Sequence, residues 1–346
     1  MTNMDYIRVG ATDTDNRTYQ YLLAVLLLLA GLAMIMAVAS SAVSADPLPP
    51  DITSDVTITG DQYFNDSSTN LSANIIVSSG GNLTFDNVTV DVVNNYITIE
   101  VDAGGRLAVN NSEIMVDSGG YDIYLYQDGS MVLTGNTIGG YSGFYLYTPN
   151  ATIDSNNLNP MASYVDALYA SYGWNSYSMD GPFITNNVFG DANSGIYIDG
   201  YGATLNKIDI KDNTFGYLYY YGIYLGLNSA TTTEVNVINN NFTYVSYYGI
   251  DVVLEYGTFP KLNVDDNVIQ DTGSNPIYID AAWSSYPNSE WSISGNEVHG
   301  MSWYTGIDLE AYYSTLGNVS IDRNTIPNMG TAINFYNYYG GSNDVS

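Results

Sequence analysis

The sequence predicts an all-β protein, a single-stranded right-handed parallel β-helix of about eleven coils. Two short phrases alternate along the chain, and both keep one period of about 27 residues. Gly, Asn and Asp separate the phrases, and no helical hydrophobic period follows Ala45. This period is too long for a six-residue left-handed coil and too short for a four-stranded propeller blade, which favours one β-helix turn per repeat.

The first phrase is a short alternating strand that ends in Asn-x-apolar, as in ITNNVF and IKDNTF. Its asparagines are spaced by 26 to 29 residues. We expect them at one corner of each coil, because Asn tolerates a left-handed turn and its amide can bond the next coil. The expected ladder is Asn187, Asn213, Asn240, Asn267, Asn296 and Asn324, with weaker N-terminal copies at Asn87, Asn111, Asn136 and Asn156.

The second phrase is a small residue or Pro followed by an alternating strand. Alternation sends successive side chains to opposite faces of a sheet. The inward pairs are therefore Ile196/Ile198, Ile223/Leu225, Ile250/Val252, Ile277/Ile279, Ile307/Leu309 and Ile333/Phe335. Two outward columns follow, one of Tyr197, Tyr224, Asp251, Tyr278, Asp308 and Asn334, and one of Asp199, Gly226, Val253, Asp280, Glu310 and Tyr336.

The first 45 residues have the features of an export segment, so residues 46–346 form the expected β-helix domain. The apolar run from Tyr21 to Ala39 precedes SSAVSA, which predicts a signal peptide cleaved after Ala45. The alternative is an uncleaved membrane anchor, because 19 apolar residues just reach a bilayer-spanning length. Both readings predict an extracellular or cell-surface protein.

The amino-acid composition limits which molecules the protein can bind. The chain has 7 Lys+Arg against 36 Asp+Glu, a net charge of −29, so nucleic acid and anionic lipid are poor partners and membrane contact is expected only through an uncleaved N-terminus. Cysteine is absent, which excludes disulfides and thiolate sites. Glycosylation of an exported chain fits the Asn-x-Ser/Thr sequons at Asn65, Asn70, Asn82, Asn87, Asn110, Asn150, Asn241 and Asn318.

Over roughly residues 52–346 the two phrases resemble the right-handed β-helix repeats of the pectate-lyase-like superfamily, and the Asn-x-apolar phrase is similar to its asparagine ladder. That superfamily includes polysaccharide lyases, glycoside hydrolases, uronate epimerases, periplasmic copper-delivery proteins and surface adhesins. The resemblance therefore implies a fold and leaves the activity open.

The carboxylates of Asp280, Asp308 and Glu310 are the first candidate site. The expected coil makes Asp280 and Glu310 vertical neighbours, with Asp308 two residues from Glu310 on one strand. No cofactor is required, but such a group could bind Ca²⁺ or supply the acid and base of glycoside hydrolysis. The alternative is an acid-coated face of a strongly acidic chain.

Two features of the superfamily's enzymes are missing here. Its hydrolases place a His and basic residues beside their aspartates, whereas the only His of this chain is His299, just past an Asn corner. Lyases and epimerases need Arg or Lys to neutralise the uronate carboxylate, and few basic residues follow the export segment. Catalysis is therefore left undecided.

Aromatic residues in the turns form the second candidate site. One turn carries Tyr220, Tyr221, Tyr247, Tyr248, Trp303 and Tyr304, and the opposite turn carries Tyr256, Trp283, Tyr286, Tyr312 and Tyr313. Aromatic rings spaced along a solenoid suit stacking on sugar rings, although Tyr is also a favoured strand-edge residue. Residues 161–182 lengthen one coil to a spacing of 31, which predicts a protruding loop with Trp174 and Tyr177.

The last residues, Asn343 to Ser346, match the start of the strand at 317–320, but the chain stops before another Asn. An open solenoid end is normally capped, so we expect a longer protein, or a further domain or chain over this end. The leading hypothesis is a surface protein that binds extracellular polysaccharide or glycan without strong catalysis. The alternatives are a glycoside hydrolase using Asp280, Asp308 and Glu310, and a purely structural envelope or adhesin rod.

Overall fold

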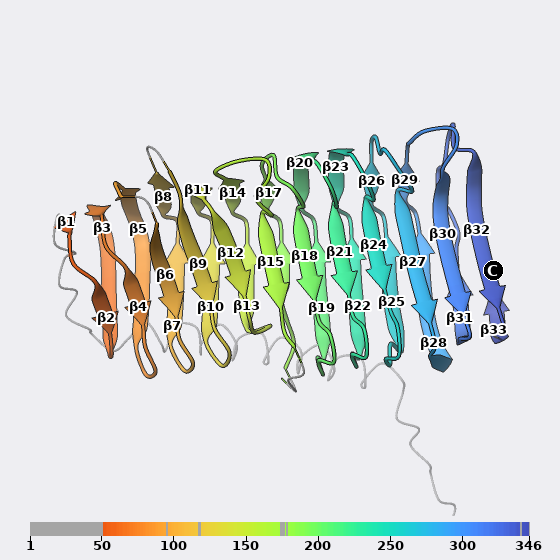
Figure 1. Ribbon diagram of the computed structural model, residues 1–346, viewed down its shortest axis with the longest axis horizontal. Helices are drawn as coiled ribbons and strands as arrows, with labels where there is room; N and C mark the ends of the chain where they lie inside the picture. Colours follow the sequence, from red (N-terminus) through yellow and green to blue (C-terminus); the bar gives the residue numbers. More distant parts are fainter. Residues whose placement is uncertain are drawn as a thin grey trace, which may run out of the picture. The chain divides into compact units, whose positions relative to one another are not determined.

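The computed structural model describes residues 51–345 except 95, 117–118, 174–176, 178 and 340. It shows an all-β parallel β-solenoid of about ten turns, close to the eleven expected (Figure 1). Within these residues there is no helix, and so none long and apolar enough to cross a membrane. The signal peptide or anchor predicted over residues 1–45 lies outside the described residues.

The smaller of the two sheets contains 12 parallel strands that follow one another in chain order along the stack (Figure 1). The second phrase of the repeat forms its later strands. The strands are β2 (Val56–Ile58), β4 (Ile75–Val77), β6 (Ile97–Val101), β9 (Tyr121–Leu125), β12 (Gly143–Leu146), β15 (Leu168–Ser171), β18 (Ile196–Asp199), β21 (Ile223–Gly226), β24 (Ile250–Val253), β27 (Ile277–Ala282), β30 (Thr305–Tyr312) and β32 (Thr331–Tyr338).

The larger sheet contains 21 strands, and the first phrase of the repeat lies in it. Its strands are β1 (Asp51–Ile52), β3 (Asp61–Leu71), β5 (Asn82–Val92), β7 (Arg106–Asn110), β8 (Glu113–Val116), β10 (Ser130–Thr134), β11 (Thr137–Tyr141), β13 (Ala151–Asp154), β14 (Asn157–Pro160), β16 (Phe183–Thr185), β17 (Val188–Phe189), β19 (Lys207–Lys211), β20 (Thr214–Leu218), β22 (Glu234–Ile238), β23 (Asn241–Val245), β25 (Lys261–Asp265), β26 (Val268–Ile269), β28 (Ser285–Ser294), β29 (Glu297–Val298), β31 (Thr315–Ser320) and β33 (Gly341–Val345).

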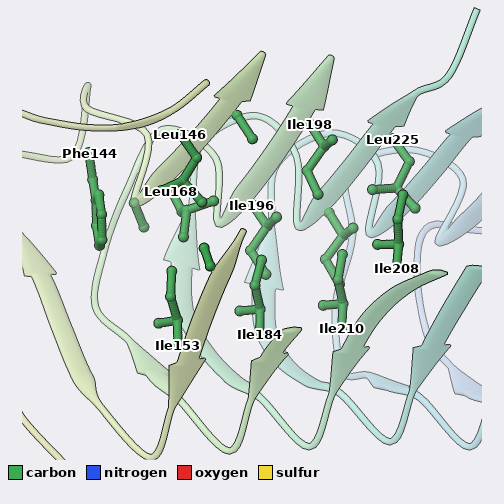
Figure 2. Close-up of a cluster of buried hydrophobic side chains, with 14 of the residues drawn as sticks. Phe144, Leu146, Ile153, Leu168, Ile184, Ile196, Ile198, Ile208, Ile210 and Leu225 are labelled. Carbon is green, nitrogen blue, oxygen red and sulfur yellow. The ribbon is translucent and has the colours of Figure 1, made fainter. Parts of the chain in front are cut away.

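The core lies inside the coils, where the alternating apolar residues of both sheets meet. Figure 2 shows Ile196 and Ile198 of the smaller sheet pointing toward Ile184 and Ile210 of the larger sheet. The predicted inward pairs from β18 to β30 are fully buried. The last pair differs, because β32 is the final strand of its sheet: Ile333 is 42% exposed and Phe335 is half-buried.

The register of the smaller sheet confirms both predicted outward columns. Tyr197 pairs with Tyr224, Tyr224 with Asp251, and the series continues through Tyr278 and Asp308 to Asn334. Two residues further along each strand, Asp280 pairs with Glu310. The sequence period was therefore sufficient to align the strands residue by residue, because a one-residue slip would turn every inward side chain outward.

The asparagine ladder is also confirmed, and its hydrogen bonds run from coil to coil. In the centre, the Nδ2 of Asn213 donates to the Oδ1 of Asn240, whose own Nδ2 donates to the Oδ1 of Asn267, both at 3.0 Å. The expected left-handed conformation belongs to the residue before each ladder position, for example Asn239 with φ 55°. Asn136 and Asn156 extend the ladder toward the N-terminus.

Two of the weaker N-terminal copies were placed one residue out of register. Asn87 and Asn111 have positive φ and occupy the turn position, not the ladder position. The ladder position after Asn111 is Ser112, whose hydroxyl accepts from the backbone N–H of Val88 at 3.0 Å and whose N–H donates to Asn136. The hydroxyl of Ser112 accepts a hydrogen bond from the preceding coil, as the amide oxygen of a ladder asparagine does. Serine in place of asparagine at this corner therefore preserves the contact between the coils.

The predicted protruding loop is only partly visible, because Trp174 lies outside the described residues. Tyr177 does not protrude: it is 8% exposed, and its hydroxyl donates to the backbone oxygens of Tyr147 and Tyr172 at 2.9 and 3.0 Å. The extra residues of this coil therefore place a tyrosine in the core, and the prediction of an exposed Tyr177 was wrong.

Candidate functional site

Four acidic residues and a tyrosine come together on the outer surface of β24, β27 and β30. We call Asp251, Tyr278, Asp280, Asp308 and Glu310 the carboxylate face. Asp251, Tyr278 and Asp308 stand in register on three successive strands, and Asp280 is paired with Glu310 beside them. The parallel register gives neighbours about 4.8 Å apart, so the carboxylates are close enough to influence one another.

The carboxylates of this face differ in whether hydrogen bonds within the protein already occupy their oxygens. Both oxygens of Asp308 accept from amides, Oδ2 from Asn275 at 3.1 Å and Oδ1 from Asn334 at 2.8 Å, and Asp308 is only 7% exposed. The hydroxyl of Tyr278 donates to Oε2 of Glu310 at 3.2 Å. Asp308 is therefore held in a structural arrangement, whereas Asp280 and Glu310 are half-buried and accessible.

Two of the carboxyl groups have perturbed pKa values. Burial, with the charges of Glu255 and Glu310, raises the pKa of Asp280 to about 6. Burial and the charge of Asp280 raise the pKa of Asp251 to about 7. Functional sites often contain carboxyl groups perturbed by burial and a like charge. The sequence placed Asp251 in the outward column but did not select it as a site residue.

The predicted metal site has no geometric support from clustering. Across the described part of the chain, no group of three or more His, Asp or Glu side chains could hold a metal ion. Asp280 and Glu310 are paired on neighbouring strands, whereas both oxygens of Asp308 accept hydrogen bonds from the amides of Asn275 and Asn334. Calcium binding by these three residues stays a prediction.

Four of the six predicted aromatic site residues meet at the entry of β21 and β24. Tyr220 stacks on Tyr247 at 5.1 Å, and Tyr221 lies parallel to Tyr248 at 6.3 Å. The next coil has Ser274 and Asn275 in this turn, which interrupts the rings. Trp303 and Tyr304 follow one coil later.

Trp303 is 77% exposed and Tyr304 is half-buried. No ring contact among the described residues joins either of them to the four tyrosines. The structure therefore brings together four of the predicted aromatic residues and leaves the other two apart.

The stacking also changes what these rings can contact. A sugar ring between two aromatic faces would need roughly 3.5–4 Å on each side, and a spacing of 5.1 Å leaves no room for it. The faces are occupied by neighbouring rings, so ring edges and hydroxyl groups are presented to solvent. Among the six predicted residues, Trp303 is the one with an exposed ring suited to stacking.

A second aromatic column lies in the opposite turn, at the exit of β24, β27, β30 and β32. Tyr256, Trp283, Tyr313 and Tyr339 stack in order, with ring centroids 6.2, 4.5 and 5.1 Å apart, and each is 41–69% exposed. All four have φ between 50° and 56°, a left-handed conformation uncommon for bulky residues. Tyr286, predicted for this turn, is instead buried, and its hydroxyl donates to Leu254 O.

The outward tyrosine column is longer than the sequence indicated. Tyr124, Tyr145 and Tyr169 precede Tyr197 in register, and Tyr197 stacks on Tyr224 at 4.4 Å. The pair Tyr124–Tyr145 stacks at 4.9 Å. The N-terminal repeats differ enough from the two phrases that alignment of the sequence with itself did not extend the column to them.

Three lysines lie on the larger sheet. Lys207 and Lys211 both contact the carboxylate of Asp209, at 3.1 and 2.9 Å, and Lys261 pairs with Glu234 at 3.0 Å. The described strands of the smaller sheet contain no Lys or Arg. The carboxylate face therefore has no cationic side chain on its own sheet.

Comparison with known proteins adds no further assignment. No protein-family profile, curated protein or solved structure matches the chain. The solenoid is established by its own strands and register.

Proposed function

We propose that this protein binds an extracellular glycan on the carboxylate face of the smaller sheet. The observation that carries the proposal is the arrangement of this face: outward carboxylates and tyrosines lie on β24, β27 and β30, a column of exposed aromatic rings follows these three strands, and the stacked pair Tyr220 and Tyr247 lies at the entry of β21 and β24. Such a surface offers hydrogen-bond acceptors and amphipathic ring edges, as sugar-binding surfaces require.

Charge narrows the glycan class. With a net charge of −29, the chain repels polyuronates and sulfated polymers unless cations bridge the two. Neutral or cationic sugars donate hydroxyl or ammonium hydrogens to carboxylates such as Asp280 and Glu310. The proposal is therefore restricted to glycans without acidic groups.

The finer assignments belong to the same proposal. We propose that the coils are right-handed, that the fold is related to the pectate-lyase-like superfamily, and that the chain is exported to the cell surface or beyond. The paired phrases, the asparagine ladder and the apolar run before Ala45 support these assignments. The asparagine ladder is the most specific of the three.

A glycan array with matched variants tests the binding function. The double variant Tyr220→Ala/Tyr247→Ala removes the centre of the entry column, and we expect it to lose most of the array signal. Tyr96→Ala serves as the control, because Tyr96 is 93% exposed beside β6 and remote in sequence from the site. Absence of binding to any neutral or cationic glycan by the wild-type protein would favour the purely structural rod.

A glycoside hydrolase is the second candidate, favoured by one observation. Asp280 has a pKa raised to about 6 and stands in register with Glu310, the pairing of an acid with a carboxylate that hydrolases use. Asp280→Asn should then abolish release of reducing ends while glycan binding persists. If the wild-type protein releases no reducing ends from any glycan that it binds, this second function is rejected.

A further inference from the structure

The carboxylate of Asp251 is enclosed by tyrosine rings. Tyr224 and Tyr278 pair with Asp251 on the strands on either side, and Tyr221 and Tyr248 come from the entry turns. Ring centroids are 4.9 Å apart for Tyr221–Tyr224, 6.3 Å for Tyr221–Tyr248 and 5.3 Å for Tyr248–Tyr278. We call these four residues the tyrosine cage. They leave Asp251 only 4% exposed, although strand alternation turns it outward.

This buried carboxylate lacks a counter-charge. Its Oδ1 atom has no hydrogen-bond partner within the described residues. The charge of Asp280 on the neighbouring strand acts on Asp251 as a further negative group, and the sheet has no basic side chain among its described strands. A buried, unpaired acid destabilises the fold by several kcal/mol, or takes up a proton, unless a cation pairs with it. The site is therefore complementary to a positive group.

The surrounding rings specify which kind of positive group fits. The rings of Tyr221, Tyr248 and Tyr278 stack on one another, so a positive group at this point meets their edges and their hydroxyl oxygens. A carboxylate oxygen at the same point accepts a charge-assisted hydrogen bond from an N–H of the cation. Tyrosine hydroxyls, unlike carboxylates, would add acceptors without adding charge.

We propose that Asp251 and the tyrosine cage bind the ammonium group of an amino sugar within the glycan. This inference rests on the proposed function and narrows its ligand to a polymer with free amines. The carboxylate face continues past the cage to Asp280 and Glu310. The remaining sugar units of a chain would therefore still meet hydrogen-bond acceptors outside the cage.

Calorimetric titration at pH 7 and low salt tests the inference with two oligomers of equal length. A glucosamine hexamer carries free amines, whereas an N-acetylglucosamine hexamer carries the same ring with the amines blocked. We expect the glucosamine hexamer to bind about tenfold more tightly or better, as one shielded charge-assisted hydrogen bond supplies. Asp251→Asn, which keeps the shape and removes the charge, should lower that affinity about tenfold.

The control variant is Asp91→Asn, which makes the same substitution at an exposed position of β5 on the other sheet. Its affinity for the glucosamine hexamer should equal that of the wild type. A lysine hexamer, with amines on an unrelated backbone, should bind more weakly than the glucosamine hexamer.

The possible outcomes separate the inference from the function that it rests on. Equal affinity for both sugar hexamers would overturn the ammonium site and leave glycan binding standing. Binding of neither hexamer, nor of any array glycan, would overturn the proposed function itself. If Asp251→Asn and Asp91→Asn weaken binding equally, or if the lysine hexamer binds as tightly as the glucosamine hexamer, diffuse charge attraction replaces the cage. Circular dichroism of each variant shows that it is folded.

Discussion

At the scale of single residues, Asp251 is the group on which folding and binding make opposite demands. Its side chain is buried and one oxygen is unpaired, which destabilises the folded protein whenever the carboxylate is ionised. A ligand cation would remove that cost on binding. Residues that lower stability in this way are characteristic of functional positions, because function and stability are not optimised together.

This predicts a specific dependence of stability on pH. The pKa of Asp251 is about 7 in the folded protein against a model-peptide value of 3.8, so between these values the folded state holds more protons. The free energy of unfolding must therefore fall as pH rises from about 4 to 7, by at most about 4 kcal/mol from this group. Urea denaturation from pH 5 to pH 8 measures it.

Asp251→Asn is the matched variant for that measurement. In this variant the free energy of unfolding should fall less steeply as pH rises. The variant should also be more stable than the wild type at pH 8, because no buried charge forms. The groups that face Asp251 are Tyr221 and Tyr224 from the coil before, Tyr248 from its own, and Tyr278 and Asp280 from the coil after. Of these, Asp280 titrates in the same range, with a pKa of about 6, and adds a slope of the same sign in both proteins. Equal slopes in the two proteins would show that Asp251 is not perturbed.

The ladder asparagines give a second prediction at this scale. Asn240→Ala removes the Oδ1 that accepts from the backbone N–H and Nδ2 of Asn213, at 3.1 and 3.0 Å. Buried donors without partners cost about 1–3 kcal/mol each, so thermal unfolding should begin at a clearly lower temperature. Asn318→Ala on an exposed position of β31 is the control and should change stability little. A ladder variant as stable as that control would contradict this role.

At the scale of elements, small residues before the strands of the smaller sheet set the distance between coils. A Cβ at Gly222 would lie 2.2 Å from the backbone oxygen of Gly249 and 2.6 Å from the ring of Phe242. Gly195 and Gly249 have similar contacts with the next coil. This close approach explains why the second phrase of the repeat begins with glycine at Gly195, Gly222 and Gly249.

Gly222→Ala should therefore destabilise the protein by about 1–3 kcal/mol or more, because backbone atoms must move to admit the methyl group. Gly60→Ala is the matched control, since a Cβ there meets nothing within 4 Å. Chemical denaturation of both variants measures the difference. The explanation fails if the two substitutions have the same effect.

The strands of the smaller sheet were the part of the structure that the sequence predicted best. Strict alternation in β18 to β30 predicted burial and register correctly, because only one register buries every inward residue. The N-terminal corner at Asn111 was misplaced by one residue, since Ser112 can take the ladder position and neighbouring asparagines make the phrase ambiguous. Tyr177 was predicted to be exposed, because a longer loop gives no sign that it folds back into the core.

The candidate site was less predictable than the fold. The period placed Asp280, Asp308 and Glu310 on one face, but the amides of Asn275 and Asn334 that occupy Asp308 come from the adjoining turn and the next strand. The enclosure of Asp251 depends on how four tyrosine rings pack, which alternation does not encode. Ring stacking likewise decides which aromatic faces stay free.

At the scale of the whole molecule, charge governs what can approach the solenoid. A chain with a net charge of −29 attracts cations over a distance set by the ionic strength. Affinity for a glucosamine oligomer should therefore fall as salt rises from about 0.05 M to about 0.5 M, while affinity for an uncharged oligomer stays nearly constant. Titration calorimetry over this salt range checks the contrast. A salt-independent affinity for the amine-bearing oligomer would mean that its charge is not recognised.

The most direct measurement of the central claim is a crystal structure of the protein with a bound oligosaccharide. We predict a sugar chain on the outer surface of β24, β27 and β30, beside the exit aromatic column, with polar contacts to Asp280 and Glu310. A chain bound instead on the larger sheet, with the carboxylate face empty at saturating ligand, would contradict the claim.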